Sequence, residues 1–277
     1  MKNNFIIKIL VHSNVFIALL AFSISYIANI LIGKEPDLIL MLIAFSVMFF
    51  IYTINRFSDL KEDEINAPNR VNFIYKYGKY LLSVSSLAFI SSILYAVVYR
   101  PAMAIYIFLP VLIGIIYSFF GLKRIFLMKN VFVGMAWGIL ALINGAYYEA
   151  FSPQLISFSI IVGVMMIINS TVFDLKDIEG DSFHNITTLP VKLGIGKTKI
   201  VCSMLNLSLV MFTAGLFYLH IFSGIISVIF LLYVYIFLYI YFAKPVNNPL
   251  FYGIFVDGEL TFIALILMIL RSVIVEG

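Results

Sequence analysis

Long apolar runs are the feature of this chain that most limits what it can fold into. Stretches of about 20 apolar residues recur along the whole sequence, and this is the length that an α-helix needs to cross a lipid bilayer. Only 12% of the residues are charged, against about 25% in a typical soluble domain. The sequence therefore predicts an all-α, polytopic membrane protein and excludes a soluble globular domain.

The ends of the apolar runs predict nine membrane-spanning helices. They occupy residues 10–32, 38–57, 80–99, 102–120, 131–149, 154–173, 200–219, 222–243 and 253–275. The segments between them are short, and none is long enough to form a soluble domain. We therefore expect residues 1–277 to form one membrane-embedded domain.

Lysine and arginine are distributed unequally between the two sides of this nine-helix arrangement. Of the 18 basic residues, all but Lys34, Arg100 and Arg271 fall on the side that holds the N-terminus. Positive charge collects on the cytoplasmic side of membrane proteins. We therefore expect a cytoplasmic N-terminus, in an integral protein of the cell membrane.

Two acidic clusters lie at the ends of apolar runs, both on the predicted cytoplasmic side. Their polar positions are spaced i, i+4, i+8 in the first cluster and i, i+3, i+7 in the second, so that each set shares one face of a helix. The residues are Asn55, Asp59 and Asp63 in the first cluster, and Asp174, Asp177 and Asp181 in the second. Because charge at the edge of a bilayer is costly and usually marks a function, we expect the clusters to form a site rather than only to balance nearby lysines and arginines.

The chemistry of the clusters favours a hard divalent cation. Mg²⁺ prefers a few carboxylates together with the phosphates of a substrate, and neither cluster contains a thiol or an imidazole that would favour a softer metal. We therefore expect Mg²⁺ as cofactor and a diphosphate as substrate. The expected ligands are Asp59, Asp63, Asp174, Asp177 and Asp181.

Three segments of the chain resemble the UbiA-type intramembrane prenyltransferases. The first acidic cluster, with Arg56 in second position, matches the family motif N-x-x-x-D-x-x-x-D. The second cluster matches D-x-x-D-x-E-G-D and continues into T-L-P-V-x-x-G at residues 188–194. A third stretch, which contains Tyr117, Lys123 and Arg124, resembles the loop between the family's fourth and fifth helices. The resemblance covers nearly the whole chain.

This resemblance implies a reaction and a set of roles. Two Mg²⁺ ions held by the clusters would bind the diphosphate of an allylic isoprenoid and neutralise the charge that develops as it leaves. An allylic carbocation would then combine with an acceptor, with no protein nucleophile. Asn55 and the five aspartates would be the catalytic residues. The groups expected around the diphosphate are Arg56, Arg70, Tyr117, Lys123 and Arg124.

The resemblance leaves the acceptor open between two classes. One is an aromatic ring such as a hydroxybenzoate or a naphthoate, and the other is a glycerol-phosphate ether lipid, whose phosphate could use Arg70, Lys76 and Lys79. The expected partners are therefore a prenyl diphosphate, one of these acceptors and membrane lipids, with no nucleic acid. A cation-coupled membrane transporter is the alternative function, although such a protein favours acids near the midplane of the bilayer.

Overall fold

The computed structural model describes residues 9–119 and 125–276, except for the side chains of residues 117, 119 and 274–276. Within these ranges every regular element is helical, which confirms the predicted all-α class. In chain order the elements are α2 (Val15–Leu31), α3 (Leu38–Ser58), α4 (Leu60–Asn66), α5 (Pro68–Tyr99), α6 (Pro101–Phe119), α7 (Met128–Leu140), α8 (Ile143–Tyr148), α9 (Pro153–Asp174), α10 (Ile178–Phe183), α11 (Leu189–Tyr218), the 3₁₀ helix η2 (Gly224–Val228), α12 (Ile229–Phe242), the π-helix η3 (Phe251–Val256) and α13 (Glu259–Glu276).

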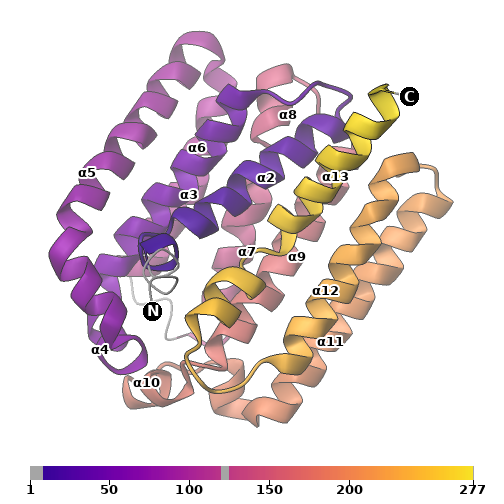
Figure 1. Cartoon of the computed structure of the whole chain (residues 1–277). Helices are drawn as coiled ribbons and strands as arrows, with labels where there is room; N and C mark the ends of the chain where they lie inside the picture. Colours follow the sequence, from indigo (N-terminus) through magenta and orange to yellow (C-terminus); the bar gives the residue numbers. More distant parts are fainter. Residues whose placement is uncertain (1–8, 120–124, 277) are drawn as a thin grey trace.

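The long helices form a bundle in which successive helices run in opposite directions (Figure 1). Helix α5 lies on one flank of the bundle and the α11–α12 pair on the other, with the remaining long helices between them. The short helices α4 and α10 contact each other at one end of the bundle. The fold therefore brings the two acidic clusters, which are more than 100 residues apart in sequence, to the same end.

Six described helical segments are long and apolar enough to cross a membrane, where the sequence predicted nine spans. These are Leu38–Ser58, Pro68–Tyr99, Met128–Tyr148, Pro153–Asp174, Leu189–Tyr218 and Gly224–Phe242. Each predicted span overlaps a helical segment, but Val15–Leu31 and the apolar part of α6, Pro101–Ile116, are shorter. The first span is shortened because the chain turns at Ser13 and Asn14, where Asn14 has a left-handed φ of 63°.

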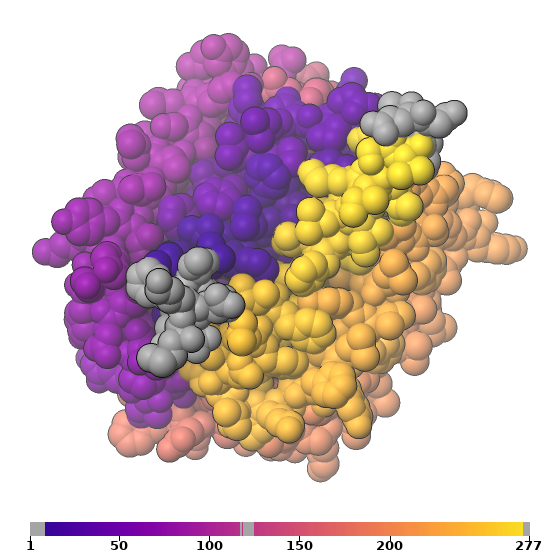
Figure 2. Space-filling view, viewed as in Figure 1, coloured from indigo at the N-terminus to yellow at the C-terminus, as the bar shows by residue number. Residues whose placement is uncertain are grey.

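The outward faces of the flanking helices are apolar. On α5, Leu87 and Val98 are 68% and 70% exposed, and on α11 Met211 is 69% exposed. The C-terminal part of the chain forms a continuous band across one face of the molecule, made of α12, the segment that follows it and α13 (Figure 2). Such surfaces fit a lipid environment, because an α-helix satisfies its own backbone hydrogen bonds and can present apolar side chains to lipid.

The three basic residues predicted to lie apart from the others do gather at the end of the bundle away from α4 and α10. Arg271 pairs with Glu35 at 3.0 Å. Lys34 lies over the ring of Tyr148, and Arg100 lies over the ring of the adjacent Tyr147. These three described residues therefore lie at the opposite end of the bundle from the two acidic clusters.

Helices α7 and α9 pack through glycines. A Cβ atom added to Gly134 would lie 2.5 Å from the carbonyl oxygen of Gly163 and 2.6 Å from Cγ1 of Ile167. One added to Gly138 would lie 3.1 Å from the carbonyl oxygen of Ser159. Small residues at such interfaces let two helix backbones approach closely within a membrane.

We expect Gly134→Ala to destabilise the protein, because the new methyl group overlaps the backbone of α9. Overpacking of this kind costs about 1–3 kcal/mol, and it should lower the melting temperature measured in detergent. Gly215→Ala on α11 is the matched control, since its Cβ would meet nothing within 4 Å. Equal melting temperatures for the two variants would show that the α7–α9 contact tolerates a side chain.

Candidate functional site

A cavity of about 210 Å³ collects the residues of both acidic clusters. Its wall comes from α2 and the segment that leads into it, from α3 to α7, from α9, α10 and the turn between them, and from residues 186 and 247–257. The predicted site residues that line it are Asn55, Arg56, Asp59, Asp63, Arg70, Asp174, Asp177 and Asp181. Lys123 and Arg124 lie outside the described residues, and so does the side chain of Tyr117.

The first cluster spans the junction of α3 and α4. The helix bends at Asp59, which has φ −98° and ψ 7°, yet the i to i+4 hydrogen bonds continue through the bend. The amide of Asp59 donates to the carbonyl of Asn55 at 3.0 Å, and the amide of Asp63 donates to the carbonyl of Asp59 at 2.9 Å. The predicted spacing is therefore preserved, and all three side chains face the cavity.

The second cluster surrounds the turn between α9 and α10. Asp174 is the last residue of α9, Asp177 precedes α10, and Asp181 lies within α10. The amide of Asp177 donates to the carbonyl of Asp174 at 3.2 Å, and the amide of Asp181 donates to that of Asp177 at 2.9 Å. The chain thus breaks its long helix here, but it keeps the three aspartates on one side.

Asn66, at the end of α4, joins the two clusters. Its Oδ1 accepts a hydrogen bond from the amide of Gly180 at 3.1 Å, and its carbonyl accepts one from Nδ2 of Asn247 at 2.7 Å. A Cβ atom on Gly180 would overlap the side chain of Asn66. A side chain at position 180 would displace that of Asn66, so glycine preserves the hydrogen bond by which α10 and α4 join the two clusters.

Basic residues neutralise the aspartates directly. Nε of Arg70 donates to Oδ2 of Asp63 at 2.8 Å, and Nζ of Lys176 lies 2.6 Å from Oδ2 of Asp177. Lys129, in the first turn of α7, lies 2.6 Å from Oδ1 of Asp174 and 3.8 Å from Oδ2 of Asp181. Next to it, Nδ2 of Asn130 donates to Oδ2 of Asp174 at 3.0 Å.

The sequence did not identify Lys129 and Lys176 as site residues. Both count among the basic residues on the predicted cytoplasmic side, and Lys129 also belongs to the stretch that resembles the loop between the family's fourth and fifth helices. For Lys176 the available signal was its position beside Asp177, inside the second cluster. For Lys129 the signal was its place beside Asn130 at the start of an apolar run. The helix that begins there packs against α9, and this packing places both residues beside Asp174.

The second cluster retains an excess of negative charge. Burial tends to raise the pKa of Asp177, but Lys176 and Lys129 outweigh this effect and hold that pKa below its ordinary value. Burial raises the pKa of Asp181 to about 7, since Lys129 offsets only part of the effect while Asp174 and Asp177 repel a further charge. Burial also lowers the pKa of Lys176, against the attraction of Asp177. Added positive charge would therefore be favourable beside Asp181.

The donor set suits Mg²⁺ in its chemistry. Aspartate and amide oxygens line the cavity, and these are hard ligands of the kind that Mg²⁺ accepts alongside phosphate oxygens. Among the described residues, however, no three acidic, histidine or cysteine side chains converge as a preformed metal site. The protein's own lysines and arginines bind the carboxylates instead. A divalent cation would therefore replace part of the positive charge that these side chains place beside the aspartates.

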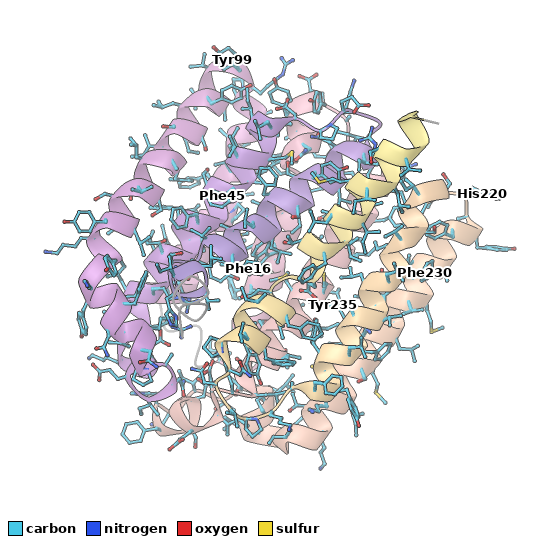
Figure 3. All side chains as sticks on the ribbon, viewed as in Figure 1. Phe16, Phe45, Tyr99, His220, Phe230 and Tyr235 are labelled. Atoms are coloured by element: carbon cyan, nitrogen blue, oxygen red, sulfur yellow. The ribbon has the colours of Figure 1, made fainter. Side chains whose placement is uncertain are left out.

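Away from the charged end, the cavity is apolar and aromatic. Met48, Ile51 and Phe132 contribute to its wall, as does Phe16 of α2, which lies near the middle of the bundle in Figure 3. Trp137 is only 1% exposed. Its Nε1 donates to the hydroxyl of Tyr52 at 3.1 Å.

Two further acidic residues interrupt the last apolar run, and the first of them lies in the cavity wall, which the sequence analysis did not predict. Asp257 lines the cavity at the break between η3 and α13. Glu259, which is fully buried, accepts hydrogen bonds from Nδ2 of Asn169 at 3.0 Å and from the hydroxyl of Tyr239 at 2.9 Å. Two carboxylates within four residues of an apolar run were the signal that could have located this break.

Comparison with known proteins agrees with the geometry of the cavity. The model of the UbiA prenyltransferase family matches residues 14–249. A relative from Methanosphaera stadtmanae, named digeranylgeranylglyceryl phosphate synthase, is 28% identical over 192 residues, which are 68% of each chain. The structure of a UbiA homolog from Aeropyrum pernix is similar with a TM-score of 0.71, 15% identity and coverage of 91% and 98%. A UbiA homolog from Archaeoglobus fulgidus, bound to DMAPP and Mg²⁺, gives a TM-score of 0.65 at 16% identity, with coverage of 93% and 98%.

We expect Lys129→Met to destabilise the protein, because it leaves Asp174 and Asp181 buried beside each other without their shared counterion. Removing one partner of a buried ion pair costs about 3–5 kcal/mol. Thermal unfolding in detergent measures the effect, with Lys197→Met on the exposed part of α11 as control. Adding Asp174→Asn to Lys129→Met should restore part of the loss, and a double variant less stable than Lys129→Met would contradict the role of this ion pair.

Proposed function

The chain belongs to the UbiA prenyltransferase family, and we propose that it transfers an isoprenoid group from an allylic prenyl diphosphate to a glycerol-phosphate ether lipid. One observation carries the proposal. Both acidic clusters and four basic side chains line a single cavity whose other part is apolar and aromatic. Such a cavity can hold a diphosphate at its charged end and a hydrocarbon chain at its apolar end.

The donor site would be formed by the two clusters. Asp59 and Asp63 from one side, and Asp174, Asp177 and Asp181 from the other, would hold Mg²⁺ against the diphosphate. When bound, the metal would neutralise the negative charge that develops on the leaving diphosphate. Two solved structures of a UbiA homolog from Archaeoglobus fulgidus, one bound to DMAPP and Mg²⁺ and the other to GPP and Mg²⁺, share this fold and support the proposal.

The basic residues of the clusters would bind the diphosphate in turn. Arg70, Lys129 and Lys176 hold carboxylates in the present arrangement, and metal ions bound by those carboxylates would release them toward the phosphate oxygens. Preorganised positive charge of this kind is usually the largest contribution to stabilising a developing anion. Tyr117, Lys123 and Arg124, expected from the sequence at the same place, would add to it.

The apolar part of the cavity would receive the isoprenoid and shield the allylic carbocation from water. Aromatic rings near a cation stabilise it by about 0.5–2 kcal/mol each. Trp137 and Tyr52 are held in place by their mutual hydrogen bond, so that their rings keep a fixed position in the cavity wall. The chain supplies no nucleophile in this scheme. The bond between the allylic carbon and the diphosphate would break, the oxygen of the acceptor hydroxyl would bond to that carbon, and the hydroxyl proton would pass to the released diphosphate.

The choice of acceptor draws on the relative named digeranylgeranylglyceryl phosphate synthase. Of the residues predicted to bind a lipid phosphate, Arg70 lies in the cavity, whereas Lys76 and Lys79 are exposed on α5 and do not line it. We therefore do not assign Lys76 and Lys79 to the acceptor. The separation of basic residues between the two ends supports an active site that faces the cytoplasm.

Both clusters should be essential for turnover. We expect Asp59→Ala and Asp177→Ala each to lower kcat by at least about 10²- to 10³-fold, the effect typical of removing one electrostatic group from an active site. Glu35→Gln, at the far end of the bundle and paired with Arg271, is the control. EDTA should silence the wild-type enzyme and Mg²⁺ should restore it. Activity within threefold of wild type in either aspartate variant would remove the two-metal proposal.

Release of pyrophosphate should depend on the acceptor. Purified protein in detergent with Mg²⁺ and geranylgeranyl diphosphate should release pyrophosphate with a prenylglyceryl phosphate lipid and not without it. Hydroxybenzoate and naphthoate are the comparison acceptors, and transfer to either of them alone would assign the protein to the aromatic class. Ion flux in proteoliposomes without any release of pyrophosphate would favour a transporter.

A further inference from the structure

The four basic residues that line the described part of the cavity are not equivalent. Arg70, Lys129 and Lys176 each form a salt bridge with an aspartate of the two clusters. Arg56 forms no salt bridge with any carboxylate among the described residues, although it too lines the cavity. It follows Asn55 directly on α3, so its side chain leaves the helix about 100° around the axis from the face that carries Asn55 and Asp59.

Arg56 is held by a residue from another helix. Its Nε donates to Oδ1 of Asn14 at 3.0 Å. Asn14 is 1% exposed, lines the same cavity, and precedes α2. Within the described part of the chain, its Nδ2 is buried and has no hydrogen-bond partner. The pair therefore offers the outer nitrogens of a guanidinium and one amide N–H that no described group satisfies.

The backbone of Asn14 is also unusual. Its φ of 63° lies in the left-handed region, which asparagine tolerates better than most residues but which still costs free energy. This turn separates residues 9–12 from α2 and directs the Asn14 side chain onto Arg56. A strained residue, an unsatisfied amide and a basic side chain that forms no salt bridge among the described residues thus meet at one place in the wall.

We propose that Arg56 and Asn14 bind the phosphate of the acceptor lipid. A guanidinium can bind two phosphate oxygens at once, and Nδ2 of Asn14 would donate to the same group. In the proposed function, the aspartates with their metal and the three paired basic residues would match the charge of the donor diphosphate. A second anion in this cavity needs its own cation. Among the described residues that line the cavity, Arg56 is the cation that forms no salt bridge, while Asp59, Asp63 and Asp257 attract it from farther away. The inference rests on the proposed function, and it reassigns Arg56 from the diphosphate, where the sequence placed it.

The test compares loss of the arginine with loss of the phosphate. Wild type and Arg56→Ala are assayed with a prenylglyceryl phosphate and with the same lipid lacking its phosphate, at saturating prenyl diphosphate. In wild type, removing the phosphate should lower kcat/KM for the acceptor by about 10- to 150-fold, the range for a hydrogen-bonded charge. For the phosphorylated lipid, Arg56→Ala should have a kcat/KM that is lower than that of wild type by a similar factor. For the lipid without its phosphate, the kcat/KM of Arg56→Ala should be almost the same as that of wild type. Its KM for the prenyl diphosphate should stay within threefold, which also shows that the variant is folded.

Two further variants separate this role from a structural one. Asn14→Gly keeps the left-handed backbone but removes the amide, so it should reduce the preference for the phosphorylated lipid without changing the KM of the donor. Lys76→Ala with Lys79→Ala removes positive charge outside the cavity and should leave that preference unchanged. If Arg56→Ala raises the KM of the prenyl diphosphate as much as that of the acceptor, Arg56 serves the donor and the assignment fails. If wild type prenylates only aromatic acids, the proposed acceptor class fails together with it.

Discussion

Burial of carboxylates at the end of an apolar helix bundle is the constraint on which the rest of this structure depends. Asp174 is fully buried, and Asp63 and Asp181 are nearly so. Charges removed from water in this way are stable only when other charges and hydrogen bonds compensate them. The chain meets this requirement with Arg70, Lys129 and Lys176, each delivered by a different segment. The packing of those segments is therefore set by the need to bring their basic residues to the aspartates.

Close backbone contacts make that delivery possible. Glycines 134, 138 and 163 let α7 lie against α9, so that Lys129 and Asn130 at the start of one helix reach Asp174 at the end of the other. At the same end of the bundle, Gly180 allows α10 to contact α4 through Asn66. A side chain at Gly134 would meet the backbone of α9 at 2.5 Å, so it would push the two helices apart.

Much of the site could be predicted from the sequence because its spacing is local. Asn55, Asp59 and Asp63 recur with the helical period, and the hydrogen bonds carry that period through the bend at Asp59. The parts that could not be predicted depend on breaks in helices or on partners distant in sequence. Mean hydropathy does not reveal the turn at Asn14. It also assigns Asp257 and Glu259 to an apolar run, because their neighbours in the sequence are apolar. No local pattern links Arg56 to Asn14, which lies 42 residues earlier.

The charges that line the cavity have a consequence for the order in which ligands enter. Seven carboxylates and four basic side chains line it among the described residues, an excess of three negative charges when all are ionised. A prenyl diphosphate arriving alone would meet net repulsion, whereas divalent cations would meet net attraction. In the proposed function, each ligand would therefore improve the affinity for the other, and such coupling is reciprocal. In a membrane that contains many other phosphorylated lipids, an anion delivered without a metal would then be repelled by the same aspartates that would retain the metal-bound donor.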